Sequence, residues 1–450
     1  MNKFLIIVTL LFTQNFVFAQ VKSYTLKESI DLALSNNLSI KNAILGVETA
    51  NKQIDFAYTS TLPKIDVNSK YIRNFQKQII FFPNQQTGIA TPIKIGSDNS
   101  LSSDVTISQI VFNSAAFKAP ELAKEYAVLS QKQVLNEGTQ TILNIKKSYL
   151  SAMFLREVLV VQKQSLNNLE ESANISKLLF EKGLRPEIDA IRSRVQADNQ
   201  LPLVTNATDN YKNALDGLKL IMGIPENEQI DVKDTIWQIP KNDESITGNN
   251  ELVRKNLEIG NPQLQTLKII QSLNEKFIDI KKSDYLPTVA AFGTYQLQTQ
   301  FDGFSEFSLK PTSFVGLNAT WNIFNGGRTN DTIEIQKIEI EKNKIQYNNA
   351  LNSFSTQTKL ALRRMESAKE RVMASENTIM LAEKGYKIAN ASYKAGAATQ
   401  LQVSDADLAL SQSKLLRLNA IYDYNISLTE YESLFGFNIM YENNNLKVKN

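Results

Sequence analysis

Three carboxylates in this sequence follow closely behind two glycines at predicted helix ends. Glu187 and Asp189 follow Gly183 in "EKGLRPEIDA", and Asp405 follows Gly396 in "YKAGAATQLQVSDA". The dipole of a helix stabilises a carboxylate near its N-terminus by about 0.3 to 1 kcal/mol, which explains Glu187 and Asp189 without a function. Asp405 lies too far into its predicted helix for that explanation, so it is the strongest candidate for a functional charge.

Most catalytic and ligand chemistry is excluded by composition. The 450 residues contain no His and no Cys, which excludes His-based triads, thiol nucleophiles and His/Cys metal sites. We find neither a Walker-type loop nor a Gly-rich dinucleotide motif, and we expect no enzyme activity, no cofactor and no metal. The 49 Lys and Arg residues nearly balance 46 Asp and Glu, so a nucleic-acid partner is not predicted either.

The N-terminus reads as a secretory signal peptide. Lys3 precedes an apolar run, and the small residue Ala19 provides a cleavage site, so the mature chain is predicted to begin at Gln20. No cysteine is present to carry a lipid anchor. No later run of about 18 apolar residues could form a membrane-spanning helix, so any passage through a bilayer must use strands.

Ordered landmarks show that the chain is duplicated. Asn37 and Asn261 lie 224 residues apart, as do Leu62-Pro63 and Leu286-Pro287. Phe112-Asn113 and Phe324-Asn325 lie 212 residues apart, and the later pairs lie 213 apart. Those later pairs are Gly183 and Gly396, Tyr211 and Tyr424, and Gly223 and Gly436. One insertion of 12 residues between Pro63 and Phe112 accounts for the change of offset.

Each repeat changes its hydrophobic period after the Leu-Pro pair. Residues 26–62 show helical spacing, whereas "SFVGLNATWNIF" alternates apolar and polar residues, as a strand with one apolar face does. "VAAFGTYQLQ", "KIDVNSKY" and "DVTISQIVF" alternate too, which predicts four strands of roughly ten residues, enough to cross a bilayer when tilted. The Gly- and Pro-containing stretches between paired strands, including "QKQIIFFPNQQTGIATPIKIGSDNS", are predicted to be hairpin loops.

The remaining segments are long helices. Residues 113–183 and 325–396 keep helical periodicity for about 70 residues, or roughly 105 Å, and the return segments run for about 60 Å. The predicted organisation is therefore mainly α with membrane β. It comprises a signal peptide (1–19), a first repeat (20–236; β-hairpin about 63–112, helix pair about 113–223), and a second repeat (237–450; linker, helix, β-hairpin about 286–325, helix pair about 326–436, C-terminal tail).

Four membrane strands cannot stand alone, because an open sheet edge leaves backbone N–H and C=O groups unsatisfied in hydrocarbon. Known barrels need at least eight strands, so other copies of the chain must supply the missing ones. Two copies would give eight strands and a filled lumen, and three would give twelve strands with an open bore. The residues by themselves leave both numbers open.

The chain resembles the TolC-type outer-membrane efflux protein family over essentially the whole mature sequence. The resemblance is carried by the signal peptide and, in order, by "LKESIDLALSNN", the duplicated Leu-Pro, "WNIFNGGR", "YKAGAATQLQVSDA" and "YESLFGF". It implies a homotrimer in the outer membrane of a Gram-negative bacterium, with a twelve-stranded barrel that continues into an α-helical periplasmic tunnel. It also implies two partners, a periplasmic adaptor (membrane fusion protein) and an inner-membrane transporter of RND or ABC type.

The resemblance assigns roles to the tip residues. It places Asp405 on the helix that lines a closed tunnel entrance, where Gln402 replaces a second acid found in many relatives. Threefold symmetry would make Asp405 a three-carboxylate constriction that attracts cations. Asp189 and Glu187 in the other tip are the further candidates for lining the entrance, and Asp407 lies beside Asp405. Arg185, and Arg192 after it, are expected either to pair with tip acids and hold the entrance shut or to be solvated.

The tip turns have a structural explanation as well. Gly183 and Gly396 are predicted left-handed helix caps, and Thr399 and Gln402 have the spacing of a capping box that starts the return helix. Pro186 suits the first turn of the other return helix. Adaptor contact is expected in the grooves around the two glycines, because a partner reaching the tips would meet these turns first.

Aromatic residues mark the strand ends. Phe112, Trp321 and Phe324 are expected at the membrane interface or in the joint between strand and helix. The main hypothesis is an outer-membrane exit duct of a tripartite efflux pump or type I secretion system. The alternatives are a soluble periplasmic coiled-coil adaptor or scaffold, which needs no strands with apolar faces, and a carboxylate-based hydrolase that would depend on Asp405.

Overall fold

The computed structural model describes residues 21–83, 90–235, 239 and 250–437. The predicted signal peptide (1–19), most of the linker that opens the second repeat and the C-terminal tail lie outside the described residues. The chain divides into two compact units. The helical unit contains the described parts of 1–45, 131–266 and 347–450, and the sheet unit contains those of 46–130 and 267–346. Each predicted repeat contributes residues to both units.

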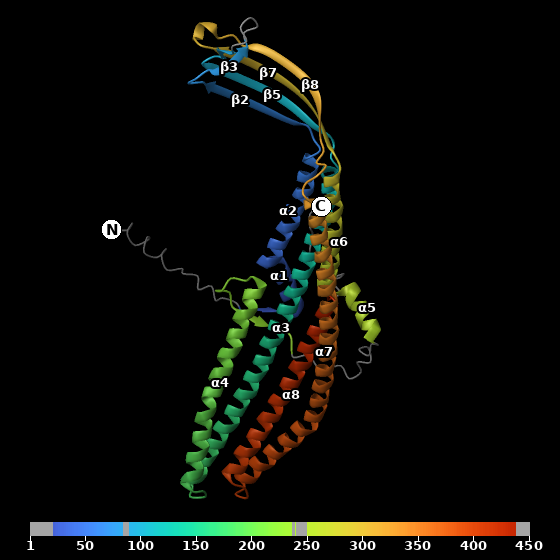
Figure 1. Ribbon diagram of the computed structural model, residues 1–450. Helices are drawn as coiled ribbons and strands as arrows, with labels where there is room; N and C mark the ends of the chain where they lie inside the picture. Colours follow the sequence, from blue (N-terminus) through green and yellow to red (C-terminus); the bar gives the residue numbers. More distant parts are fainter. Residues whose placement is uncertain (1–20, 84–89, 236–238, 240–249, 438–450) are drawn as a thin grey trace, which may run out of the picture. The chain divides into compact units, whose positions relative to one another are not determined.

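The fold is mainly helical, as the sequence predicts (Figure 1). The helices are α1 (Leu26–Asn36), α2 (Leu38–Thr59), α3 (Ser114–Glu181), α4 (Glu187–Met222), α5 (Asn250–Gly260), α6 (Pro262–Lys282), α7 (Arg328–Lys394) and α8 (Gln400–Leu434), with short 3-10 turns η2 (Ser283–Tyr285) and η3 (Phe304–Glu306). At 68 and 67 residues, α3 and α7 are each about 100 Å long. Among the described helices, none has both the length and the apolar character that a membrane span requires.

The sheet unit is built around four antiparallel strands in the order β2-β5-β7-β8 (Figure 1). They are β2 (Lys64–Arg73), β5 (Asn99–Phe112), β7 (Thr288–Phe301) and β8 (Lys310–Thr320). Each repeat supplies one antiparallel pair, and β5 and β7 join the two pairs. Because side chains alternate along a strand, this register sorts the residues onto two faces. Strands β2 and β8 are the two edges.

One face of this sheet is largely apolar, and the other is largely polar apart from Phe292 and Phe314. The cross-strand row Val67, Val105 and Tyr295 lies on the first face, as does the row Ile65 and Ile107. On the opposite face, Asn68 and Asp104 are paired, and the Nδ2 of Asn68 lies 3.2 Å from the Asp104 carboxylate. The predicted alternation of polar and apolar residues is therefore present in the structure.

The predicted loop "QKQIIFFPNQQTGIATPIKIGSDNS" contains a second small sheet. Strands β3 (Gln78–Pro83) and β4 (Ala90–Ile95) pair antiparallel to each other. The loop interpretation was wrong for these two segments. The prolines at each of them favoured a loop, whereas the β-branched and aromatic run Ile79–Phe82 follows strand propensity.

The helix predicted over residues 26–62 is broken in two at Asn37. Its backbone leaves the helical region (ψ 127°), and its Oδ1 accepts hydrogen bonds from the backbone N–H groups of Ser39 (2.8 Å) and Ile40 (3.3 Å), so it starts α2 as an N-cap. Asn261 repeats this role before α6, where its Oδ1 accepts from the Leu264 N–H at 3.0 Å. The duplicated asparagines are therefore helix-start signals.

Two duplicated glycines pack against these breaks in the helical unit. Gly223 (φ +66°) and Gly436 (φ +81°) each follow the end of a return helix. A Cβ added to Gly223 would lie 2.9 Å from the Asn36 side chain, and one added to Gly436 would lie only 2.5 Å from the Gly260 carbonyl oxygen. Close backbone approach and positive φ together explain why glycine stands at both positions.

A hydrophobic core joins α1, α3 and α4 within the helical unit, together with a two-stranded parallel sheet of β1 (Lys22–Tyr24) and β6 (Ile230–Val232). Tyr149 is completely buried, and its hydroxyl donates to the Tyr24 carbonyl at 2.8 Å. Burial raises the pKa of Tyr149, so this hydroxyl stays protonated. The contact ties β1 to the middle of α3.

Candidate functional site at the helical tips

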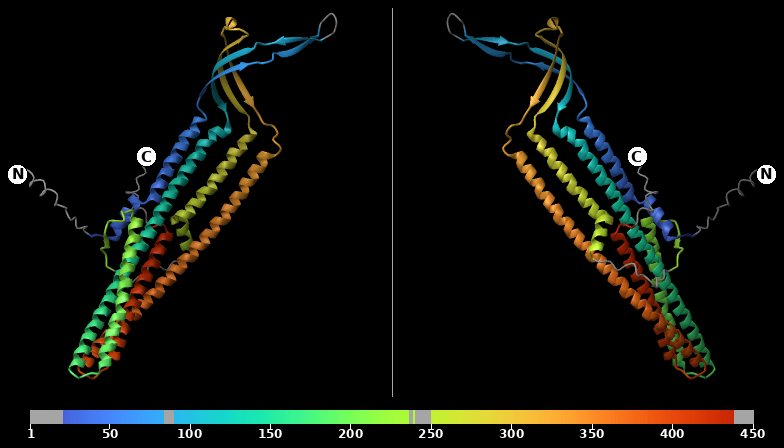
Figure 2. Two further views of the ribbon diagram at one scale, coloured as in Figure 1. Left: turned by 90° about the vertical axis from the view of Figure 1, so that its left-hand side faces the viewer. Right: turned by 90° about the vertical axis from the view of Figure 1, so that its right-hand side faces the viewer.

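The turn between α3 and α4 and the turn between α7 and α8 lie side by side in the helical unit (Figure 2). Both turns begin with the same cap. Gly183 has φ +70°, and the Leu184 N–H donates to the Leu179 carbonyl at 2.9 Å. Gly396 has φ +83°, and the following N–H donates to the Ser392 carbonyl at 2.8 Å. These are two Schellman motifs, and the predicted glycine caps are confirmed.

The two return helices begin differently. Thr399 caps α8 with the predicted capping box: its Oγ1 accepts from the Gln402 N–H at 3.4 Å, and its own N–H donates to the Gln402 Oε1 at 2.9 Å. Pro186 is the N-cap of α4, one position before the helix, and makes no side-chain cap hydrogen bond. The first turn of α4 instead contains Glu187 and Asp189, where the dipole favours them.

The predicted entrance residues differ in how free their side chains are. Asp405 and Glu187 are exposed, and Asp189 is partly exposed. Gln402 is exposed too, but its amide is used in the capping box. The convergence of these acids around one entrance stays a prediction for an assembly.

Arg185 crosses from one tip to the other. Its guanidinium donates to the Ala398 carbonyl at 2.6 Å and lies 5.3 Å from the centre of the Tyr393 ring. No ion pair joins Arg185 to a carboxylate within the described part of the chain. The expected pairing with tip acids is therefore replaced here by a carbonyl and an aromatic face, which a planar guanidinium can contact at once.

A buried polar seam runs between α3 and α8 above the tips, and the sequence interpretation missed it. Its centre is Asp407, whose side chain is only 2% exposed. Ser165 Oγ and Asn168 Nδ2 each donate to the Asp407 carboxylate at 2.6 Å, from residues about 240 positions away in the sequence. Further toward the tip, Ser172 Oγ donates to Gln400 Oε1 at 3.1 Å.

The seam continues to α7, where the hydroxyls of Ser176 and Tyr393 lie 2.7 Å apart, both groups being fully buried. A buried polar group stabilises a fold only when its hydrogen bonds are made, and here they link the two helical hairpins of one chain. The signal was present in the sequence as Ser165, Asn168, Ser172 and Ser176, which recur at helical spacing on one face of α3.

Burial governs the electrostatics of the seam. Burial raises the pKa of Asp407, and the hydrogen bonds from Ser165 and Asn168 and the charge of Lys414 oppose that rise. Burial also raises the pKa of Tyr386 to about 12, with the negative charges of Asp407 and Glu171 acting in the same direction. Among the described residues, Asp407 accepts two hydrogen bonds and forms no ion pair. Burying a carboxylate in this way is costly.

The predicted interface aromatics lie in the sheet unit. Phe112 is the last residue of β5, Trp321 follows β8 directly, and Phe324 lies in the segment before α7. Their exposed fractions are 40%, 60% and 84%. The Trp321 indole N–H donates to the Tyr285 carbonyl at 3.1 Å, so one end of this ring is held while its face stays open. Their contact with lipid stays a prediction.

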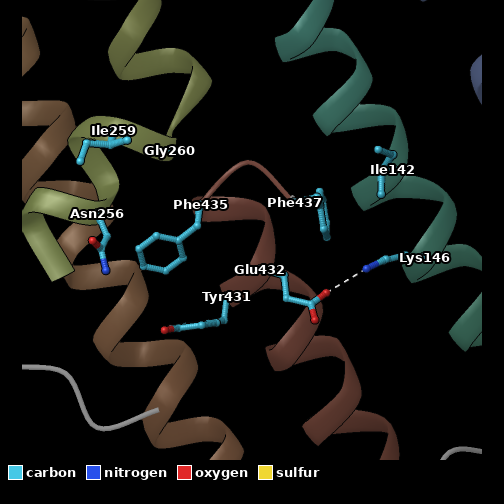
Figure 3. Close-up of a pocket in the computed structure, with 9 residues that line it drawn as sticks. All are labelled: Ile142, Lys146, Asn256, Ile259, Gly260, Tyr431, Glu432, Phe435 and Phe437. Carbon is cyan, nitrogen blue, oxygen red and sulfur yellow. Dashed lines mark hydrogen bonds and ion pairs between the residues drawn. The ribbon is translucent and has the colours of Figure 1, made fainter. Parts of the chain in front are cut away.

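A pocket of about 670 Å³ lies at the far end of α8 from Asp407 (Figure 3). Its lining combines apolar side chains with the ion pair between Lys146 and Glu432, whose charged atoms lie 2.8 Å apart. Phe437 covers the Lys146 ammonium at 4.4 Å. Because the two charges neutralise each other, this pocket offers no free charge to a ligand, and we assign it to the packing of α3, α5 and α8.

Comparison with known proteins identifies this architecture. The model of the family described as outer membrane efflux protein matches residues 29–224 and 253–436, one match in each repeat. The chain belongs to the outer membrane efflux protein family. The two matches have nearly the same length and bracket the same elements, which agrees with the duplication.

Individual relatives are distant but similar over nearly their whole length. The outer membrane protein TolC of Escherichia coli (strain K12) is 21% identical over 413 residues, which are 89% of this chain and 80% of TolC. The Campylobacter jejuni CmeC outer membrane channel superposes with a TM-score of 0.77 at 18% identity, covering 94% of this chain and 90% of CmeC. VceC of Vibrio cholerae gives 0.73 at 14%, covering 91% and 96%. This outer membrane efflux protein therefore has the fold of those channels.

Proposed function

We propose that this chain forms the outer-membrane exit duct of a tripartite efflux pump or type I secretion system, and that it works as a homotrimer. Family membership and the channel fold support the proposal. The single observation that carries it is the four-stranded sheet. Among the described residues both of its edges lack a hydrogen-bonded neighbour, and one of its faces exposes apolar side chains.

The unpaired edges require more copies. Strands β2 and β8 each have one side without a hydrogen-bonded neighbour in the described residues. Their apolar side chains are open: Val67, Val315 and Leu317 are 73 to 88% exposed. Such a sheet in lipid must close through β2 of one copy and β8 of the next. Three copies give twelve strands, and the polar face with Asn68 and Asp104 then lines the bore.

The tips supply the periplasmic entrance. In a trimer, the exposed Asp405 would occur three times around one axis. The three negative charges would attract cations into the constriction, because a cation offsets their mutual repulsion. Gln402 adds no charge because a glutamine amide is neutral, and its Oε1 accepts the Thr399 N–H in the capping box. Asp189 and Glu187 in the first hairpin are the next candidates for lining the entrance. The contacts of Arg185 with Ala398 and Tyr393 join the two tips and hold the entrance closed.

The adaptor is proposed to dock on exposed apolar residues beside the tip turns. On α4 these are Ile188, Ile191 and Val195, spaced three and four residues apart and about half exposed. On α8, Leu401 and Leu408 lie seven apart and are 55 and 56% exposed. This spacing presents one stripe on each helix, which suits an amphipathic helical hairpin of a periplasmic adaptor. The inner-membrane transporter would then act through that adaptor.

Membrane extraction and native mass together test the proposal. The full chain, expressed with its own leader, is expected to stay with outer membranes after an alkaline wash and to have a native mass in detergent of about three times one chain. A periplasmic adaptor or scaffold would be released by the wash. Recovery of a washed-out monomer would overturn both the location and the trimer.

A further inference from the structure

The β3–β4 hairpin carries an apolar surface that the described residues of the chain leave exposed. Of its twelve residues, only Lys94 is charged. Ile79, Phe81 and Phe82 are 49, 64 and 49% exposed, and Ile93 is 47% exposed. A two-stranded hairpin is marginally stable by itself in water, and an apolar patch of this kind marks a contact surface.

Both faces of the hairpin are apolar, which is unusual for an exposed sheet. The pair Ile80 and Ile93 lies on one face with Phe82, and Ile79 and Phe81 lie on the other. A hairpin that packed against a single partner would need only one apolar face. Two apolar faces fit a segment that is contacted from both sides.

The hairpin is fastened to the outer end of the four-stranded sheet. It continues directly from β2 and β5, and the Asn74 N–H donates to the Asp98 carbonyl at 2.7 Å where the two hairpins meet. Lys77 forms ion pairs with Asp98 (3.5 Å) and Asp302, and the Asp98 N–H donates to the Asp302 carboxylate at 2.7 Å. Figure 2 shows the hairpin extending beyond the four strands. Its root is thus fixed to the ends of β2 and β5, and β2 is an edge strand of the sheet.

We infer that each β3–β4 hairpin packs between the equivalent hairpins of two other copies of this chain, an inference that rests on the proposed trimer. A closed ring of three is the smallest assembly in which every copy has a neighbour on both sides, matching the two apolar faces. The hairpin root lies at the β2 edge, where the proposed trimer places the next copy. Six residues of strand reach about 20 Å.

That reach exceeds the radius of the proposed barrel. Twelve strands spaced about 4.8 Å apart and tilted by about 40° give a circumference of roughly 75 Å and a radius of about 12 Å. Three apolar hairpins can therefore meet over the outer mouth. Their association would narrow that mouth and shield the exposed isoleucine and phenylalanine side chains from water.

Single cysteines test this contact cleanly, because the chain has none of its own. Phe81→Cys is placed in the hairpin, and Ser305→Cys, exposed in the η3 turn of the sheet unit, is the matched control. With a trifunctional maleimide, Phe81→Cys is expected to give covalent trimers, whereas Ser305→Cys gives few. A native trimer in which Phe81→Cys links no better than Ser305→Cys would overturn the hairpin contact and leave the duct proposal standing.

Conductance gives a second readout that does not depend on cross-linking. Ile80→Ser together with Phe81→Ser removes apolar surface from both faces, and we expect open-pore conductance in planar bilayers to rise at least about twofold. Phe304→Ser, 88% exposed in the other outer turn, is the control. An unchanged conductance in a native trimer contradicts the inference. If the natural protein itself is not a trimer, that result would instead refute the proposed function.

Discussion

The two helical tips have the same turn geometry but differ in how the return helix after the turn begins. Gly183 and Gly396 have similar positive φ values and open space where a Cβ would stand. After the turn, α4 starts at Pro186 without a side-chain cap, whereas α8 starts at Thr399 with a complete capping box. Duplication has kept the backbone geometry and allowed the two helix starts to diverge.

The acids diverge in the same way. Glu187 and Asp189 lie in the first turn of α4 at the surface, while α8 has no acid in its first turn. It carries Asp405 exposed and Asp407 buried. The second tip therefore has both an exposed carboxylate, Asp405, and a buried one, Asp407, that is hydrogen-bonded to α3. The first tip has acids only at or near the surface. We conclude that the second hairpin differs from the first by its buried acid.

Removing the buried acid should have the largest effect. Asp407→Ala leaves the donors of Ser165 and Asn168 without acceptors, at about 1 to 3 kcal/mol each, so we expect local opening of the tip to become easier by about 3 kcal/mol, or roughly a hundredfold in exchange rate. Hydrogen–deuterium exchange over 401–410 in the trimer measures this. Asp405→Ala, two residues away and exposed, should change exchange by less than about 0.5 kcal/mol. Equal changes in exchange for Asp407→Ala and Asp405→Ala would show that the hydrogen bonds of Asp407 do not stabilise the contact between α3 and α8.

The glycine caps come next. Gly183→Ala and Gly396→Ala should each destabilise their turn by about 1 to 2 kcal/mol, because only the left-handed backbone opposes the new Cβ. Gly385→Ala is the control: it lies inside α7 with equal open space and ordinary φ, and it should stabilise the helix by roughly 0.5 to 1 kcal/mol. Thermal unfolding midpoints distinguish the expected destabilisation at Gly183 and Gly396 from the expected stabilisation at Gly385. Strongly unequal costs at Gly183 and Gly396 would contradict the equivalence of the two turns.

The helix starts should break the symmetry between the tips. Thr399→Ala removes a capping box and should cost about 1 kcal/mol, whereas Pro186→Ala removes no cap hydrogen bond and should cost less than about 0.5 kcal/mol. Exchange at the first amides of α8 and α4 reports each separately. A larger loss of helix stability from Pro186→Ala than from Thr399→Ala would contradict the conclusion that only α8 has a side-chain cap.

The smallest expected effect is a pH dependence of the seam. Because burial raises the pKa of Asp407 in the folded tip, the folded tip binds more protons than the opened one between the unfolded value of about 3.9 and the raised value. The contribution of Asp407 to stability therefore increases as pH falls through that window and decreases as pH rises. The difference in exchange between the natural protein and Asp407→Asn isolates it, and a difference that is independent of pH would contradict the shift.

Much of this fold could be predicted because its signals are local. The Asn37 and Asn261 landmarks, the Gly183 and Gly396 caps and the Thr399 capping box each depend on a few neighbouring residues. The alternation in the strands likewise showed which residues share a face. The family resemblance followed from the order of these same signals, and the family match confirms it.

The buried seam was not predicted, although its polar residues share one face of α3, because Asp407 lies about 240 positions from the residues that donate to it. Along α3 and α8 apolar residues appear on more than one side, so the sequence does not tell which polar residues face inward. Asp405 and Asp407 are close in sequence, yet about 200° apart around a helix with 100° per residue. One is therefore exposed and the other buried. The β3–β4 hairpin was missed for a different reason, since its prolines outweighed the short "IIFF" run.

Single-channel recording tests the central claim most directly, namely that several copies of this chain close into one water-filled conduit. The purified assembly in a planar lipid bilayer is expected to give discrete conductance steps with cation selectivity, and Asp405→Asn should reduce that selectivity while the steps persist. A trimer or a monomer that inserts into the bilayer and passes no current would contradict the account.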